Sequence, residues 1–283
     1  MASPSIAIVV TFFGQPPVWL PAFLVSCRSN PDVTWFIYTN LGDVTFPCPD
    51  NVIFKSLTLE EFNRRASDGL GMRIEIEPAF RYKLCDFKPT YGVVFSDDLG
   101  PFDYWGCSDL DIIWGDIRSF VTDAVLQEHD IVTSRVRKLA GHFTLFRNTP
   151  SINRTYELIP DVAREMTQPE YRHLDERTLT EQLRGRAGDG SGTASAGPRV
   201  YWQRELTMSA AYQRALGNTD ADSLWWRNGR TFAADGSELM YLHFHKLKKR
   251  MQTIDFGFDE APDAFRITRQ GVFAHAGAVA AGS

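Results

Sequence analysis

Two aspartates one residue apart, Asp109 and Asp111, follow an apolar, aromatic run that begins at Tyr104. The run has the composition of a buried strand, and alternation along a strand places both carboxylates on one side of it. Carboxylate oxygens suit Mg²⁺ or Mn²⁺, which complete their coordination with water and with substrate phosphates. We therefore expect a divalent-cation site that holds a diphosphate. A pair of surface turn acids is the alternative.

A second Asp-x-Asp copy, Asp220 and Asp222, lies in a polar stretch with no strand before it. We expect this copy to be a loop, because ligands of open α/β sheets lie beyond the carboxyl ends of strands. Asp116 precedes apolar residues at helical spacing and is typical of a helix N-cap.

Two histidines near the end of the chain carry a second chemical signal. Residues 238–246 are predicted to form a strand on which His243 and His245 share one face. Imidazole combined with carboxylate favours Mn²⁺ over Mg²⁺, so a late histidine would complete the cation site. The basic residues 246–250, Lys246 among them, would grip a diphosphate or contact an anionic membrane surface. A solvated basic turn is the alternative.

Further candidates lie at the ends of earlier elements. Thr11, Phe12 and Phe13 end the first apolar run and would border a nucleotide base, although core packing explains two phenylalanines equally well. Lys83, Asp86 and Lys88 precede a predicted helix that has Pro89 in its first turn. The lysines would neutralise the charge of a leaving group, and the carboxylate would bind a ribose or sugar hydroxyl. Their alternative is a charged turn in solvent.

Three residues are candidates for the acceptor side of a reaction. His142 opens an apolar strand and would face a sugar, although a lone histidine at such a place is more often structural. Asp175 and Glu176 open a predicted helix, where acids are favoured by the helix dipole alone. The functional interpretation makes one of them the carboxylate that faces the acceptor, either positioning its hydroxyl or acting as a general base.

Strands and helices that alternate from the first residues must position these groups. Apolar strands are predicted at residues 6–13, 34–39 and 51–55, with helices at 21–27 and 58–69, the second opened by a capping box of Thr58 and Glu61. This alternation predicts an α/β fold with a mostly parallel central sheet and flanking helices.

The rest of the chain contains fewer strong signals. Residues 185–198 are rich in Gly, Ser and Ala and are expected to be a mobile loop. Asn228 and Gly229 predict a hairpin in which Trp225 and Trp226 point to opposite faces, one of them toward an acceptor groove. Residues 256–283 are expected to be a peripheral tail outside a single domain of residues 1–255.

The composition excludes several classes of protein. The net charge of the 283 residues is −5, which disfavours nucleic acid as the main partner. No apolar run approaches the roughly 20 residues that span a bilayer. The first residues do not resemble a secretion signal, so a cytoplasmic location is expected, peripheral to the inner face of the membrane if the basic run binds it.

Four motifs together resemble a known family. They are WGCSDLD at 105–111, KLCDFKP at 83–89, GHFTLFRN at 141–148 and HFHK at 243–246. Over residues 6–250 the chain is similar to bacterial glycosyltransferases of the GT-A fold that have an Asp-x-Asp motif and are assigned to polysaccharide biosynthesis.

The resemblance implies a nucleotide-sugar donor, usually a UDP-sugar, with Mn²⁺ or Mg²⁺ as cofactor. It implies that Asp111 and His243 ligate the metal, that Asp109 touches the ribose or the metal, and that three further residues surround the donor: Lys83, Asp86 and Lys246. His245 departs from the family pattern, in which a polar residue that is not a ligand is expected.

Three functions are open from the sequence. The first is a metal-dependent, hexosyltransferase-type enzyme that transfers a sugar to the hydroxyl of a saccharide or lipid-linked saccharide. The second is a sugar-phosphate nucleotidyltransferase, for which residues 13–17 are a poor phosphate loop. The third is a non-catalytic carbohydrate-binding protein that uses Trp225 or Trp226 as a platform.

Overall fold

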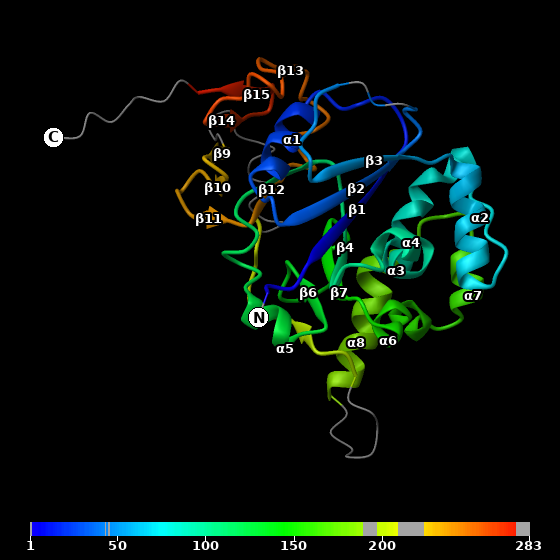
Figure 1. Ribbon diagram of the computed structural model, residues 1–283. Coiled ribbons are helices and arrows are strands. Elements are labelled where there is room, and N and C mark those ends of the chain that lie inside the picture. Colours follow the sequence, from blue (N-terminus) through cyan, green and yellow to red (C-terminus); the bar gives the residue numbers. More distant parts are fainter. Residues whose placement is uncertain (1, 43, 45, 189–196, 209–223, 276–283) are drawn as a thin grey trace.

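The computed structural model describes residues 2–42, 44, 46–188, 197–208 and 224–275 (Figure 1). Residues 189–196 of the expected loop, and the second Asp-x-Asp copy at Asp220 and Asp222, lie outside the described residues. Among the described helices, none is long and apolar enough to cross a membrane.

A sheet of seven strands forms the centre of the molecule, in the order β3-β2-β1-β4-β7-β6-β8. The first four strands of this order are parallel, β7 is antiparallel to both of its neighbours, and β8 is parallel to β6. The strands are β1 (Ile6–Phe12), β2 (Val33–Thr39), β3 (Val52–Ser56), β4 (Tyr104–Ser108), β6 (Ile131–Thr133), β7 (Phe143–Arg147) and β8 (Val200–Tyr201). The predicted α/β fold with a largely parallel sheet is confirmed.

Helices cover both faces of this sheet (Figure 1). α1 (Leu20–Arg28) packs on one face. The other helical segments are α2 (Leu59–Leu70), η1 (Pro78–Thr90), α3 (Tyr91–Val94), α4 (Ser96–Leu99), α5 (Asp123–Glu128), α6 (Pro150–Asn153), η2 (Thr155–Leu158), α7 (Val162–Thr167), η3 (Leu174–Thr178) and α8 (Leu179–Gly188). The predicted N-cap of α2 is confirmed, because the Thr58 side chain accepts a hydrogen bond from the backbone N–H of Glu61.

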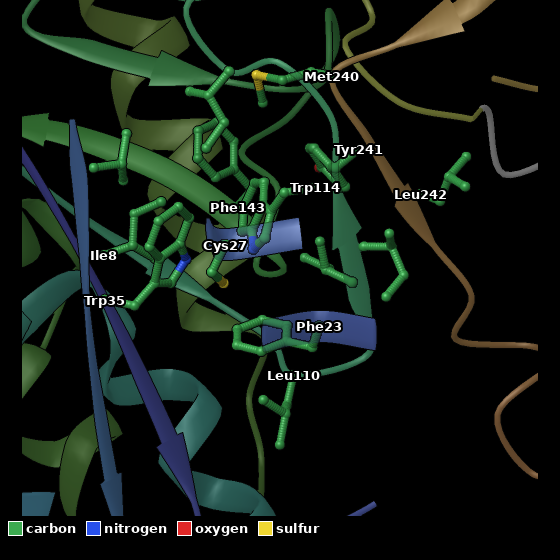
Figure 2. Packing of buried hydrophobic residues seen from close by; sticks show 14 of the residues in the cluster. Ile8, Phe23, Cys27, Trp35, Leu110, Trp114, Phe143, Met240, Tyr241 and Leu242 are labelled. Atoms are coloured by element: carbon green, nitrogen blue, oxygen red, sulfur yellow. The ribbon is translucent and has the colours of Figure 1, made fainter. Parts of the chain in front are cut away.

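The apolar run of β1 separates two cores. Its alternate residues Ile6, Ile8 and Val10 face the α1 side, whereas Ala7 and Val9 face the α2 side, and all five are buried. Figure 2 shows the first core. The ring centroid of Trp114 lies 6.0 Å from that of Trp35 and 5.6 Å from that of Phe143. A two-sided strand therefore accounts for the continuous apolar sequence.

A second sheet of six strands forms from the last part of the chain, in the order β11-β10-β9-β14-β15-β13. Its strands are β9 (Leu224–Arg227), β10 (Arg230–Phe232), β11 (Glu238–Leu239), β13 (Thr253–Ile254), β14 (Ala264–Ile267) and β15 (Gly271–Ala274). The predicted hairpin is confirmed, since Asn228 and Gly229 have φ of 46° and 81° and join β9 to β10.

The C-terminal residues differ from the expected peripheral tail. β14 pairs with β9 and with β15, and Phe265, Ile267 and Val272 are fully buried. Phe265, Ile267 and Val272 are the apolar residues of two short strands, and they point inward by alternation. Residues 264–274 are therefore part of the packed protein.

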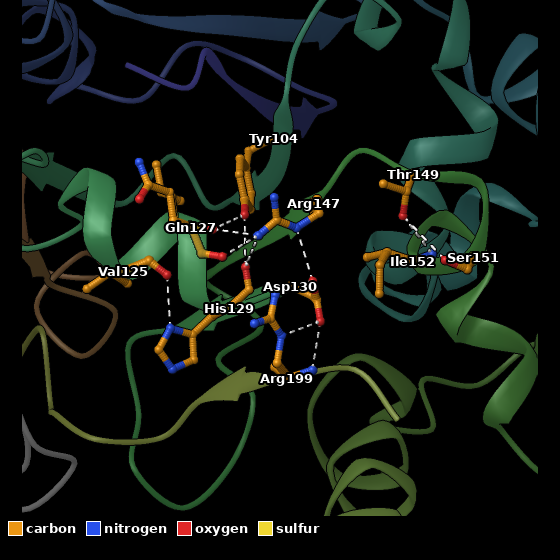
Figure 3. A network of polar contacts seen from close by, with 11 residues as sticks. Tyr104, Val125, Gln127, His129, Asp130, Arg147, Thr149, Ser151, Ile152 and Arg199 are labelled. Atoms are coloured by element: carbon orange, nitrogen blue, oxygen red, sulfur yellow. Dashed lines mark hydrogen bonds and ion pairs between the residues drawn. The ribbon is translucent and has the colours of Figure 1, made fainter. Parts of the chain in front are cut away.

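A polar network joins the end of β7 to the residue before β6 and to α5 (Figure 3). Arg147 donates to Asp130 at 3.0 Å and to three carbonyl oxygens at the end of α5 and just beyond it, those of Leu126, Gln127 and His129. The last carbonyls of a helix have no partner within the helix, and a cation there is favourable. Arg147 thus has a structural role.

Candidate functional site

A cleft of about 330 Å³ opens where β1 ends, between η1, the 109–111 connection and the turn that follows residue 243. We refer to it as the cleft. Six of the predicted site residues line it: Thr11, Phe12, Phe13, Lys88, Asp109 and Asp111. His245 and Lys248 line it as well. The position agrees with the rule that ligands bind beyond the carboxyl ends of parallel strands.

A two-stranded ladder brings the motif at residues 105–111 next to the motif at residues 243–246. β5 (Ile112–Trp114) pairs antiparallel with β12 (Tyr241–His243), and His243 lies opposite Ile112, next to Asp111. The backbone N–H of Phe244 donates to the carbonyl of Asp111 at 3.2 Å. His243 Nε2 lies 3.5 Å from Asp111 Oδ1 as a result.

The two aspartates do not share one strand face. β4 ends at Ser108 and β5 begins at Ile112, so Asp109 and Asp111 belong to the connection between two strands. Strand alternation therefore does not apply to them, and their side chains have different partners: Lys88 for Asp109, and His243 with Lys248 for Asp111.

Asp111, His243 and His245 form the candidate metal cluster. One ligand atom from each lies within 4.8 Å of the others. Both ring nitrogens of His243 are buried and have no hydrogen-bond partner among the described residues. A buried polar atom without a partner is costly, and a cation removes that cost. One carboxylate with two imidazoles suits Mn²⁺ better than Mg²⁺, so the donor set fits the expected metal.

Lys248 contributes a positive charge to the same cluster. Its Nζ lies 2.8 Å from Asp111 Oδ2. Burial alone would raise the pKa of Asp111, but the nearby His243, 3.5 Å away, and the charge of Lys248 hold that pKa well below its usual range. Asp111 is therefore an ionised carboxylate, as a metal ligand must be.

Lys88 lies at the base of the cleft. Its Nζ is buried and donates to Asp109 Oδ1 at 2.5 Å and to the carbonyl of Gly141 at 2.6 Å. Burial would lower the pKa of Lys88, yet the charges of Asp109 and Asp175 raise it well above the ordinary value. The lysine stays cationic and holds Asp109 at the wall of the cleft.

Lys83 and Asp86 lie outside the cleft, contrary to the expectation that they contact a donor. They form a buried ion pair at 3.0 Å, with exposed fractions of 1% and 0%. Asp86 also accepts the backbone N–H groups of Arg172 and Leu174 at 2.7 and 2.8 Å, and Lys83 donates to the carbonyl of Glu165. All these groups are used within the protein, where they join η1 to the segment around η3.

Lys246 is exposed and does not line the cleft, whereas Lys248 does. β12 ends at His243, so the residues after it turn, and alternation along the expected strand no longer decides which lysine faces inward. Within the basic run identified from the sequence, Lys248 and not Lys246 thus lies at the cleft.

The three acceptor-side candidates also lie outside the cleft. His142 Nδ1 contacts the Tyr241 hydroxyl at 2.7 Å, and its ring centroid lies 4.2 Å from that of His243. Burial, together with the charge of His243, lowers the pKa of His142 well below its usual value, so its ring is neutral. His142 therefore packs against the His243 ring of the cluster and does not line the cleft.

Asp175 and Glu176 surround Gly141 instead of facing a ligand. Burial raises the pKa of Asp175 to about 7, and Tyr171 donates to its Oδ1 at 3.0 Å. Glu176 accepts the backbone N–H of Gly141 at 3.1 Å and pairs with Lys138. These contacts place both carboxylates beside the residue whose carbonyl holds Lys88.

Residues that the sequence reasoning did not select complete the cleft. Arg81 and Tyr82 line it just before the block at 83–89, so their position was the only signal. Trp19 lines it from the start of α1 and donates to the carbonyl of Leu110 at 3.0 Å, which anchors the 109–111 connection. No pattern in the sequence identifies that contact.

Fold and site together define a mixed α/β protein with a candidate cation cluster beside a cleft at the carboxyl edge of its parallel strands. The chain belongs to DUF6625, a family of unknown function, which matches residues 8–275. No curated protein matches it.

Solved structures with a similar arrangement include two kinds of sugar transferase. Mouse xyloside xylosyltransferase 1 in its apo form is 10% identical, with 84% of this chain and 97% of that chain covered and a TM-score of 0.44. An active-site mutant of LgtC is 11% identical, with 84% and 87% covered and a TM-score of 0.42. The galactosyltransferase LgtC with donor and acceptor sugar analogues is 10% identical, with the same coverage and a TM-score of 0.38. Values this low do not transfer an activity to this chain.

Proposed function

We propose that this protein is a metal-dependent glycosyltransferase that binds a nucleoside diphosphate sugar, with a UDP-sugar as the expected donor. The observation that carries the proposal is the cluster of Asp111, His243 and His245. Asp111 and His245 line the cleft, and the buried ring nitrogens of His243 behind them have no hydrogen-bond partner among the described residues. The cleft volume of about 330 Å³ falls within the range of roughly 300–1,000 Å³ typical of small-molecule sites.

The charges around the cluster support a diphosphate as the ligand. Lys248 and Arg81 line the cleft, and Lys88 lies at its base. Positive charge placed where a leaving diphosphate develops negative charge is the electrostatic arrangement that favours its departure. Asp111, His243 and His245 would hold the cation, which supplies further neutralisation of the leaving group when bound.

Aromatic residues support a nucleoside at the other end of the cleft. Phe12 and Phe13 line it where β1 ends, and the Thr11 hydroxyl is within 2.8 Å of the Tyr91 hydroxyl. A base would stack on a phenylalanine ring, and Asp109, which is 35% exposed, would accept from a ribose hydroxyl. The acceptor would be a saccharide or a lipid-linked saccharide in polysaccharide assembly, and membrane contact through residues 246–250 stays a prediction.

The same region disfavours the nucleotidyltransferase alternative. No helix begins at Gly14, which follows β1 after one residue. The backbone N–H of Gly14 donates to Asn40 Oδ1 at 3.0 Å and is therefore used within the protein. A phosphate loop needs such backbone donors to face the ligand.

A thermal-shift screen tests the proposal directly. UDP-sugars should raise the melting temperature only with Mn²⁺, because a ligand that binds the native state alone stabilises it. Asp111→Ala should abolish the shift. Asp97→Ala, at an exposed aspartate in α4, is the matched control and should keep it. Incorporation of label from the sugar, and not from the uridine, would separate glycosyl from nucleotidyl transfer. The absence of any Mn²⁺-dependent shift would refute the proposal.

A further inference from the structure

The outer face of the second sheet carries two cross-strand rows of arginine and aromatic side chains. In the first row Phe232 lies opposite Trp225, Trp225 opposite Arg266, and Arg266 opposite Phe273, across β10, β9, β14 and β15. In the second row Arg230 lies opposite Arg227. These strands lie together in Figure 1.

Alternation along the strands explains why these residues face outward. The intervening residues Trp226, Thr231 and Phe265 are buried, and Trp226 donates through Nε1 to the carbonyl of Trp114. Side chains next to a buried residue on a strand must point to the opposite face. Of the two tryptophans in the predicted hairpin, Trp226 therefore belongs to the core and Trp225 to the surface.

This face is hollowed at the β9–β10 hairpin. The hollow has a volume of about 610 Å³ and is lined by Trp225, Arg227, Asn228, Arg230 and Phe232 among others. None of its lining residues lines the cleft. We refer to it as the hairpin hollow.

The charges in the hairpin hollow are only partly compensated. Arg230 is paired with Glu238, to which its Nε donates at 2.7 Å. The guanidinium of Arg227 lies 4.6 Å from the Trp225 ring centroid, and among the described residues no carboxylate pairs with it. Arg266, on the same face of the sheet but not among the residues that line the hollow, lies 5.8 Å from the Phe273 ring, with no described ion pair. The Arg227 charge thus lies in the hollow beside the half-buried Trp225 ring, on a chain whose net charge is −5.

We propose that the hairpin hollow binds an acidic saccharide. The apolar face of a pyranose ring would stack on Trp225 or Phe232, and an anionic group of the sugar would accept from the Arg227 guanidinium, whose planar fork matches carboxylate, sulfate and phosphate. The Asn228 side chain at the rim would bind a hydroxyl. A nucleic acid fits less well, because Arg227 and Arg230, the second of which is paired with Glu238, are few cations for a backbone that carries one charge per nucleotide. The site lies outside the cleft, so its binding does not depend on the proposed function.

Binding of defined oligosaccharides tests this inference. Alginate oligomers, dextran sulfate and neutral dextran are titrated onto the full chain by calorimetry, the first two distinguishing carboxylate from sulfate recognition. We expect an acidic oligomer to bind, neutral dextran to bind at least tenfold more weakly, and high salt to reduce the affinity.

Single substitutions test whether the acidic saccharide binds in the hairpin hollow or elsewhere on the protein. Arg227→Gln should weaken binding about tenfold, as expected for loss of one charge-assisted contact. Trp225→Ala, checked for an unchanged fold by thermal unfolding, should weaken it similarly. Arg184→Gln is the matched control, because Arg184 also stacks on a tryptophan, Trp202, at 4.4 Å and should leave binding unchanged.

Asp111→Ala should leave acidic-saccharide binding intact, so failure of the cleft proposal and failure of this one are distinguishable. Equal binding of neutral dextran, no binding of either acidic oligomer, or acidic binding that survives Arg227→Gln would each overturn the inference.

Discussion

Lys248 supplies positive charge to the buried carboxylate of Asp111. Its Nζ lies 2.8 Å from Asp111 Oδ2, and the exposed fractions are 36% for the Lys248 side chain and 4% for that of Asp111. A divalent cation bound by Asp111, His243 and His245 would have to displace or repel this ammonium group. We therefore predict that Lys248→Met, which removes the charge and keeps the chain length, strengthens Mn²⁺ binding when no nucleotide is present.

The size of the effect follows from the ion pair. Two unit charges about 4 Å apart interact by roughly 4 kcal/mol near a protein surface, and an exposed partner reduces this toward the ~0.2–1 kcal/mol of surface pairs. Lys248 is between these limits, so about 1–2 kcal/mol is expected, which corresponds to a dissociation constant roughly five- to thirtyfold lower.

Calorimetric titration with Mn²⁺ measures this change, and thermal unfolding provides a second observable. Without metal, Lys248→Met should melt at a lower temperature than the unaltered protein, because it leaves the buried Asp111 charge without its cation. With saturating Mn²⁺ most of that difference should disappear. Lys246→Met is the matched control, since Lys246 is exposed and does not line the cleft. Unchanged or weaker Mn²⁺ affinity in Lys248→Met, or an equal gain in Lys246→Met, would refute the reasoning.

Three further predictions concern the residues around the cleft. His245→Ala should weaken Mn²⁺ binding at least tenfold, whereas Asp109→Asn, which alters a residue outside the cluster, should change it by less than about twofold in the same titration. Gly141→Ala should lower stability by about 1–3 kcal/mol in denaturant unfolding, because the added Cβ would lie 2.3 Å from Asp175 Oδ2. The pKa of Asp175 is raised to about 7, so the folded protein holds this proton more tightly than the unfolded chain does. The stability from that proton is complete below about pH 4 and is lost as the pH rises to about 7. The melting temperature of Asp175→Asn relative to the unaltered protein should therefore be higher at pH 8 than at pH 4, and a constant difference would contradict the assignment.

Secondary-structure elements that are specified by a few neighbouring residues were predicted correctly from the sequence. The apolar run of β1, the N-cap Thr58 and the turn residues Asn228 and Gly229 each specify their structure within a few residues, and all three were correct. The alternation of strands and helices was sufficient for the fold class because parallel strands require crossover helices.

The site was harder to predict because burial and strand ends are tertiary properties. Lys83 and Lys88 both occur in one charged block, yet only Lys88 lines the cleft, and nothing local distinguishes them. The strand expected to carry both aspartates ends at Ser108, because β4 pairs with β1 and β7 whereas β5 pairs with β12. The alternation of apolar and polar residues in the sequence does not reveal where a strand ends and the next one pairs with a different partner.

Because β5 pairs with β12, the cation site can form only late in the synthesis and folding of this protein. Asp111 is synthesised long before His243, and the cluster exists only after residues 241–243 dock against residues 112–114. A ribosome-bound intermediate that lacks β12 would therefore have a formed parallel sheet and no complete cation site. Capture of the ion would then report on the closure of a long loop, from β5 to β12, and would stabilise only those molecules in which the two strands have paired.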